Sequence, residues 1–212
     1  MFIELCIVLS LLMLVLAYRV YKCLPALNKK KITKNADLHV MSVLGSGGHT
    51  GEMMPLIEAL SKEKKYTKFT IICADSDKLS FQHPSIPKNS ILKTIPRSRK
   101  VGQSFFTSIF TTIWSILASL TLMFQKPDLL LVNGPGVCLP VVLSVFIGNV
   151  LGISNCSIVF VESFCRVHTL SLTGKLIYNF CDLFFGHWKE LLPLKKRAQL
   201  IDLFGLNHTK AE

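Results

Sequence analysis

The sequence predicts an α/β protein: a Rossmann-like parallel sheet with helices on both faces, preceded by one N-terminal transmembrane helix. Strand-like and helix-like segments alternate from residue 37 onward, a glycine-rich turn joins the first strand to the first helix, and an uncharged apolar stretch begins the chain. We therefore expect four parts: a transmembrane anchor (1–21), a basic cytosolic linker (22–36), a Rossmann-like domain (37–188) and a divergent C-terminal tail (189–212).

The N-terminal apolar stretch runs, with its flanks, from Phe2 to Val20, about the length that crosses a bilayer. No positive charge precedes it and no A-x-A-like cleavage site follows it, which disfavours the alternative of a cleaved signal peptide. Basic residues follow it, so the positive-inside rule predicts a lumenal N-terminus and a cytosolic main domain. These residues are Arg19, Lys22, Lys29, Lys30, Lys31 and Lys34.

Composition limits the function classes. The seven cysteines include no C-x-x-C pair, which predicts free thiols in a reducing compartment and neither a disulfide framework nor a metal site. The net charge is +11, but the bases cluster beside segments expected to face a membrane, so we expect no nucleic-acid partner. Half of the residues are hydrophobic, which indicates lipid contact.

The secondary structure of the domain follows from its apolar pattern. Short apolar runs bounded by turn residues predict buried strands, and apolar residues at helical spacing predict the helices between them. The expected strands are Leu38–Leu44, Phe69–Cys73, Ile91–Ile95, Leu129–Val132, Ile158–Val161 and Leu183–Phe185, and the expected helices are Gly51–Lys62, Phe105–Phe124, Leu139–Leu151 and Thr173–Phe180.

The glycine-rich turn from Gly45 to Met53 is the strongest functional signal. A strand that enters such a turn and then a helix presents backbone N–H groups at the positive end of the helix dipole, which is an anion site suited to phosphate. A Walker A loop needs lysine where His49 stands, and a dinucleotide loop needs glycine where Thr50 stands. Asp75, at the end of the next strand, keeps the dinucleotide alternative open, as does a turn that binds nothing.

Two further loops follow strands at the same edge of the predicted sheet, where ligands collect in such folds. The second loop is Asn133-Gly134-Pro135-Gly136, which is equally compatible with an ordinary strand-to-helix turn. The third loop is Glu162–Arg166, in which Glu162 is suited to accept hydrogen bonds from a sugar or from the second loop. A structural ion pair between Glu162 and Arg166 is the alternative.

The segment Phe105–Phe124 has no charge and follows a basic cluster, Pro96–Lys100. Phenylalanine, isoleucine and leucine form a stripe along it, and serine and threonine lie elsewhere on the helix. A second membrane span would separate the first loop from the other two and prevent the sheet, so we expect a helix that dips into the bilayer interface or packs on the sheet. A core helix without lipid contact is the remaining alternative.

Together these motifs resemble the membrane-anchoring subunit of the UDP-N-acetylglucosamine transferase of asparagine-linked glycosylation. The resemblance covers roughly residues 1 to 190 and, more distantly, extends to the acceptor half of the bacterial peptidoglycan N-acetylglucosaminyltransferase. The motifs that carry it are the N-terminal anchor, Gly45–Met53, Ala74–Asp77, Pro96–Arg99, Val132–Gly136 and Glu162-Ser163.

The resemblance implies the N-terminal acceptor half of a GT-B glycosyltransferase, so that residues 37–188 form an acceptor-binding domain. It implies transfer of the second GlcNAc from UDP-GlcNAc to dolichyl-diphosphate-GlcNAc at the endoplasmic reticulum membrane. A soluble catalytic subunit would bind the donor, and the chain would be inactive alone, because too few residues follow Gly186 for a second domain. It implies no cofactor of its own.

The resemblance also suggests roles for single residues. We expect the acceptor diphosphate to bind Ser46, Gly47, Gly48, His49 and Thr50 with help from Arg97 or Arg99, and the acceptor sugar to lie near Asn133, Gly134, Pro135, Gly136, Glu162 and Ser163. His49 is the candidate general base, since imidazole titrates near neutral pH, and a simple phosphate ligand is the equal alternative.

The tail departs from the family, which usually ends in a short apolar strand that docks on the partner. Here the chain continues after Leu191 as Leu-Pro-Leu-Lys-Lys-Arg and ends in the polar residues 207–212, so we expect weaker recruitment of the catalytic subunit. Two other function classes stay open at this point: a non-catalytic membrane scaffold for the same enzyme, and a membrane-bound dinucleotide enzyme.

Overall fold

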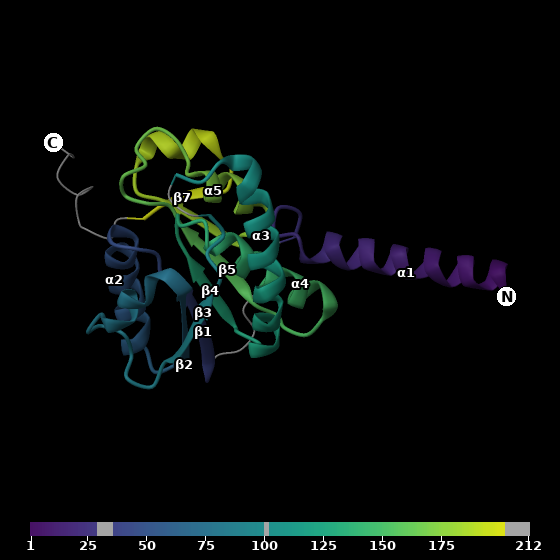
Figure 1. Cartoon of the computed structure of the whole chain (residues 1–212), viewed down its shortest axis with the longest axis horizontal. Coiled ribbons are helices and arrows are strands. Elements are labelled where there is room, and N and C mark those ends of the chain that lie inside the picture. Colours follow the sequence, from purple (N-terminus) through teal and green to yellow (C-terminus); the bar gives the residue numbers. More distant parts are fainter. Residues whose placement is uncertain (29–35, 100–101, 202–212) are drawn as a thin grey trace.

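A seven-stranded, fully parallel sheet forms the centre of the molecule (Figure 1). The computed structural model describes residues 1–28, 36–99 and 102–201. The strand order is β3-β2-β1-β4-β5-β6-β7, so the order reverses between β1 and β4, and a crevice is expected beyond their carboxyl ends. The strands are β1 (Leu38–Val43), β2 (Tyr66–Ala74), β3 (Ile91–Ile95), β4 (Leu129–Val132), β5 (Ser157–Val161), β6 (Leu183–Gly186) and β7 (Ala198–Leu200).

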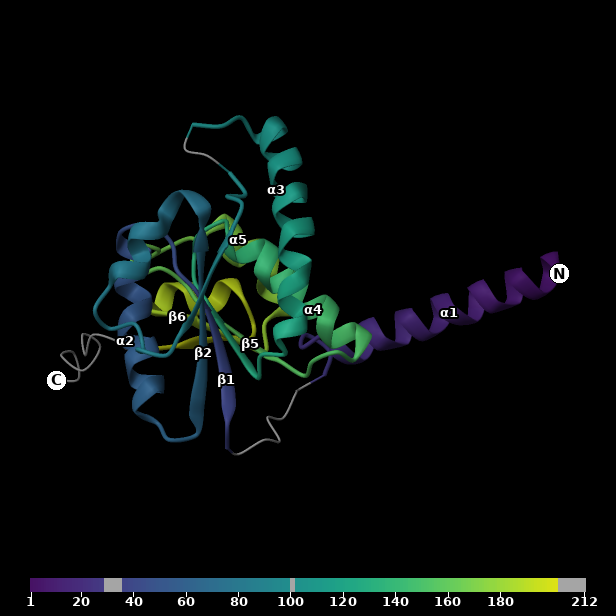
Figure 2. The same cartoon turned by 60° about the horizontal axis from the view of Figure 1, so that its bottom comes forward.

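Helices cover both faces of the sheet, which confirms the predicted fold class (Figures 1 and 2). On one face, α2 (Gly48–Lys62) packs Met53 and Ile57 against Val40 of β1. On the other, α4 (Cys138–Leu151) covers Met41 of the same strand. Because both faces of β1 are covered, all six of its residues are buried, including the polar residues His39 and Ser42.

Three further α-helices and four 3₁₀ helices complete the described elements. The predicted helix Phe105–Phe124 divides into an α-helix and a 3₁₀ helix, and so does the predicted helix Thr173–Phe180. The 3₁₀ helices η1 and η4 were not predicted. The elements are α1 (Phe2–Cys23), α3 (Phe105–Ser119), α5 (Leu172–Ile177), η1 (Asp75–Gln82), η2 (Leu120–Gln125), η3 (Tyr178–Phe180) and η4 (Lys189–Leu194).

The segment after Trp188 belongs in part to the sheet, which corrects the expected end of the domain at residue 188. The strand β7 pairs in parallel with β6, and Leu191 of η4 is fully buried. The Arg197 guanidinium donates to the carbonyl oxygens of Cys181 and Tyr178, each at 2.7 Å. Residues 189–201 are therefore fastened to the domain. The rest of the expected tail, residues 29–35 of the expected linker and residue 100 of the basic cluster lie outside the described residues.

The helix α1 leaves the domain as a straight, solvent-exposed rod, and none of its residues is buried (Figures 1 and 2). Its length and hydropathy are sufficient to cross a membrane, in agreement with the predicted anchor. At its base, Arg19 donates from Nε to the Val150 carbonyl at 2.8 Å and from Nη2 to the Asn149 carbonyl at 2.9 Å. These are the last carbonyl groups of α4, which a cation stabilises. The helix α1 is thus joined directly to the domain.

The helix α3 presents its apolar side outward and its hydroxyl side to the domain. Ser115 and Ser119 are fully buried, and Ser115 Oγ donates to the Pro96 carbonyl at 2.7 Å. The alternative of a core helix is therefore wrong, because its large side chains do not face the core. The exposed ones are Phe106, Ile109, Phe110, Ile113, Trp114 and Leu117, each at least half exposed.

Candidate functional site

The glycine-rich turn lies where β1 meets α2, and its conformation depends on one glycine. Gly47 has φ 58° and ψ −119°, a backbone conformation that residues with a Cβ rarely adopt. The helix consequently begins at Gly48, three residues earlier than predicted. Thr50 and Gly51 are the first residues to donate back, both to the Gly47 carbonyl. The N–H groups of Gly48 and His49 precede this hydrogen bonding and lie at the positive end of the helix dipole.

The first and second loops interlock through their glycines. A Cβ at Gly45 would collide with the Pro135 ring, and a Cβ at Gly134 would lie 2.9 Å from His49 Cε1. The Asn133 side-chain amide donates to the His49 carbonyl at 3.0 Å. These contacts make the two loops a single rigid unit, and they place the His49 ring against the backbone of the second loop.

A predicted diphosphate ligand, Thr50, and a residue predicted near the acceptor sugar, Asn133, hold the loops themselves. Thr50 is buried, and its hydroxyl donates to the Gly45 carbonyl, to which Ser80 Oγ also donates at 3.0 Å. Asn133 is 1% exposed, and its side-chain amide donates a hydrogen bond to the His49 carbonyl. Neither side chain lines a cavity in the described part of the chain, so their role is to shape the loops.

The third loop places Glu162 inside the protein, away from the expected acceptor sugar. Glu162 is 1% exposed, and one carboxylate oxygen accepts from the Ser171 backbone N–H at 2.9 Å. Ser171 is the N-cap of α5, so the carboxylate stabilises the start of that helix. The alternative ion pair with Arg166 is not among the ion pairs of the described residues either. Arg166 instead lines a cavity.

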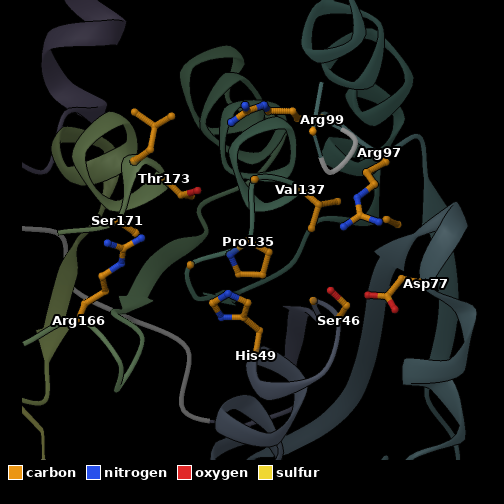
Figure 3. A pocket seen from close by; sticks show the side chains of 16 residues that line it. Ser46, His49, Asp77, Arg97, Arg99, Pro135, Val137, Arg166, Ser171 and Thr173 are labelled. Carbon is orange, nitrogen blue, oxygen red and sulfur yellow. The ribbon is translucent and has the colours of Figure 1, made fainter. Parts of the chain in front are cut away.

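An open cavity of about 540 Å³ lies beyond the carboxyl ends of the strands, as the fold predicts (Figure 3). Ser46 and His49 form its floor, Pro135 and Val137 of the second loop line its centre, and Ser171 and Thr173 lie at the far side. A second cavity of about 380 Å³ shares His49, Gly134, Arg166 and Ser171 with the first. His49 therefore stands where the two cavities meet.

The first cavity is lined by positive charge. The side chains of Arg97, Arg99 and Arg166 reach it from three directions, and Asp77 is the one carboxylate among the described residues that line it (Figure 3). Arg97 Nη1 lies 3.3 Å from Ser76 Oγ, and Arg99 donates to the Gln103 carbonyl at 2.9 Å, which orients both guanidinium groups. Three guanidinium groups beside a helix N-terminus provide the chemistry that binds a diphosphate.

Two buried cysteines near the site, Cys138 and Cys73, carry no covalent chemistry. Burial raises the pKa of the Cys138 thiol, at the start of α4, to about 12. Burial also raises the pKa of Cys73, at the end of β2, to about 11. Both stay protonated near neutral pH and are unreactive. The described residues contain no group of three or more His, Cys, Asp or Glu side chains able to hold a metal ion.

The structure brings most of the predicted site residues together. Those that line one of the two cavities are Ser46, Gly48, His49, Arg97, Arg99, Gly134, Pro135, Gly136 and Ser163. Gly47, Thr50, Asn133 and Glu162 do not line them. Sequence reasoning missed Asp77, Glu52 and the site-facing orientation of Arg166.

The fold and the site define the class: an α/β domain of GT-B-like fold with an arginine-lined cavity at its switch point. The crystal structure of Acinetobacter baumannii MurG matches with a TM-score of 0.59 at 15% identity, over 77% of this chain and 45% of that chain. A UDP-N-acetylglucosamine 2-epimerase structure matches with a TM-score of 0.51 at 18% identity, over 77% of this chain and 48% of that chain. At such identities the likeness concerns the fold.

The family follows from sequence. A family model described as "Oligosaccharide biosynthesis protein Alg14 like" matches residues 40–204, and the chain belongs to this family. The UDP-N-acetylglucosamine transferase subunit alg14 of Schizosaccharomyces pombe is 38% identical over 82% of this chain and 87% of its own length. The corresponding rat subunit is 40% identical over 78% and 82%, and the human subunit is 38% identical over the same shares.

Proposed function

We propose that this chain is the membrane-anchoring and acceptor-binding subunit of a heteromeric UDP-GlcNAc transferase. It holds dolichyl-diphosphate-GlcNAc at the cytosolic face of the endoplasmic reticulum, and a soluble catalytic subunit supplies UDP-GlcNAc for addition of the second GlcNAc. The family description and the subunit names of the relatives support this reaction class. The relatives are named as subunits of a transferase, which supports a second chain in the complex.

The observation that carries the proposal is the arginine-lined cavity at the N-terminus of α2. A diphosphate needs several donors on a rigid frame, and the interlocked loops provide such a frame. The N–H groups of Gly48 and His49 would bind one phosphate, and Arg97, Arg99 and Arg166 would neutralise the pair. The dinucleotide alternative is less well supported. A dinucleotide loop has glycine at the position of Thr50, and here the Thr50 hydroxyl donates a hydrogen bond to the Gly45 carbonyl.

His49 would act as the general base of the transfer. The acceptor hydroxyl oxygen bonds to the anomeric carbon of the donor sugar, the bond from that carbon to the phosphate oxygen of UDP breaks, and UDP leaves with the bonding electrons. The hydroxyl proton passes to the His49 imidazole. The position of His49 at the junction of the two cavities supports this role, since an acceptor in one cavity and a donor sugar in the other would meet there.

The helices α1 and α3 would set the domain on the membrane. The anchor α1 spans the bilayer with a lumenal N-terminus, and the outward apolar side of α3 lies in the cytosolic interface. Both helices lie on the α4 side of the sheet (Figure 2). Arg97 and Arg99 immediately precede α3 in the chain, so the diphosphate cavity would open at the depth of the lipid headgroups.

Trp114 provides a direct test of this membrane contact. It is 65% exposed on the apolar side of α3. In the full-length Trp188→Phe variant reconstituted into vesicles, Trp114 is the fluorophore, and brominated phospholipids in the bilayer should quench most of its fluorescence. The matched control is Trp114→Phe, which leaves Trp188 as the fluorophore. Trp188 is partly buried and donates to the Phe164 carbonyl at 2.7 Å, so its emission should change little. Equal quenching of the two variants would contradict the proposed orientation.

The proposed function itself is tested with a short-chain polyprenyl diphosphate-GlcNAc acceptor and UDP-GlcNAc. We expect no product from the purified full-length chain alone and transfer of one GlcNAc when the soluble partner is added, measured by mass spectrometry of the lipid product. Product formation by the chain alone would exclude a half-enzyme. If the chain binds the partner but the mixture transfers no GlcNAc to the acceptor, the result would favour a non-catalytic scaffold.

A further inference from the structure

We propose that Glu52 is the positioning residue of His49: it holds the imidazole in the tautomer that leaves Nε2 free to accept a proton. This inference rests on the proposed function, in which His49 is the base. Glu52 lies one helical turn after His49 on α2, and its carboxylate Oε2 is 3.5 Å from His49 Nδ1. Residues three apart on a helix face the same side, so the pair is a local consequence of the helix that the glycine turn begins.

The Glu52 carboxylate is fixed from a distant part of the chain. Its other oxygen, Oε1, accepts from Ser163 Oγ at 2.7 Å and from the Phe164 backbone N–H at 3.0 Å. These donors follow β5, more than a hundred residues further along the chain. With two donors on Oε1 and a side-chain exposure of 16%, the carboxylate has one defined orientation, in which Oε2 is turned to the imidazole.

The imidazole has little other freedom. Its Cε1 edge lies against Gly134, and the His49 carbonyl is held by Asn133. Nδ1 of His49 and Oε2 of Glu52 are both buried, and neither has another hydrogen-bond partner in the described part of the chain. Yet the His49 side chain as a whole is 34% exposed. Nε2, unlike Nδ1, is not among the buried unpartnered atoms of the described residues, and we infer that it carries part of this exposure on the side where His49 lines both cavities.

This arrangement has a chemical consequence. A carboxylate facing Nδ1 favours the tautomer with the proton on Nδ1, so that Nε2 carries a lone pair. When Nε2 takes the proton of the acceptor hydroxyl, the same carboxylate stabilises the imidazolium. Ser163 then has a role that differs from the expected sugar contact, because its hydroxyl anchors Glu52.

The test is Glu52→Gln in the full-length chain, reconstituted with its soluble partner. The glutamine oxygen keeps the hydrogen bonds from Ser163 and Phe164, but its N–H₂ group faces Nδ1 and favours the opposite tautomer. We expect kcat to fall by about 10²- to 10³-fold with the KM for the acceptor changed by less than about 3-fold. In a His49→Ala background the same substitution should cause no further loss. Ser163→Ala, which removes one anchor only, should lower kcat by less than about 10-fold.

A second readout needs no substrate. In the full-length chain labelled with ¹⁵N-histidine and held in detergent micelles, the His49 resonances should report a proton on Nδ1 in the natural chain and on Nε2 in Glu52→Gln. Identical tautomers in both, an unchanged kcat, or losses that add in the double variant would overturn the inference. A failure of the proposed function has a different signature, since the unaltered complex would then transfer no GlcNAc whatever the tautomer of His49.

Discussion

Replacing Gly48 by aspartate should abolish sugar transfer while leaving the protein folded and anchored. A Cβ at Gly48 meets no atom within 4 Å, so the side chain fits. An acidic residue in the first turn of α2 also interacts favourably with the helix dipole, so we expect no loss of thermal stability. At the start of α2, however, the carboxylate would compete with the diphosphate for the helix N–H groups and repel it. We expect transfer to fall by at least about 10³-fold, measured in the reconstituted pair.

The matched control for this prediction is Gly48→Ala, which adds a methyl group without charge. It should retain most activity, within about 10-fold of the unaltered chain, because the backbone N–H groups remain accessible. Partner recovery by co-purification should be the same for both variants. Full transfer by Gly48→Asp would show that the diphosphate binds elsewhere, and loss of the partner in Gly48→Asp alone would point to a docking surface rather than an anion site.

Removal of the His49 ring as His49→Ala should lower kcat by about 10²- to 10⁴-fold, the usual range for loss of a general base. The ring stands at the junction of the two cavities, where the acceptor hydroxyl would be deprotonated. The protein should stay in the membrane fraction, because α1 and α3 are untouched. The measurement is initial-rate kinetics with the short-chain acceptor at saturating UDP-GlcNAc.

His49→Gln separates catalysis from phosphate binding. A glutamine amide donates hydrogen bonds to a phosphate but is no base at neutral pH. If His49 is the base, this variant should be as slow as His49→Ala with a nearly normal KM for the acceptor. If the ring only binds phosphate, glutamine should restore kcat, and that result would remove the catalytic role.

The sheet could be predicted because its central strands β1, β4 and β5 are buried on both faces and so appear as mainly apolar runs bounded by turns. The strand β7 escaped prediction for a physical reason. Its sequence, Ala-Gln-Leu, has little strand propensity, and its place in the sheet depends on pairing with β6 and on Arg197 bound to carbonyls near Tyr178. The start of α2 was misplaced because it depends on the backbone angles of Gly47.

The candidate site could likewise be predicted from the sequence only in part. The glycine turn and the second loop are local signals, and both contribute to the cavity that the fold predicts. The role of Glu52 depends on Ser163, a contact between distant parts of the chain that no spacing rule reveals. Glu162 directly follows a buried strand and was expected to face the ligand, but it caps α5 through Ser171 instead. Sequence indicates which loops meet, whereas packing decides which carboxylate turns to the site.

The contact between Arg19 and the end of α4 has a mechanical consequence. A helix that crosses a bilayer changes its tilt when the hydrocarbon thickness changes. Since Arg19 fastens the base of α1 to the Asn149 and Val150 carbonyls, a change in tilt would turn the whole domain and not merely bend a tether. Transfer rates measured in vesicles of graded acyl-chain length should then pass through an optimum. The optimum is expected at the hydrocarbon thickness that places the arginine-lined cavity at the depth of the lipid phosphates.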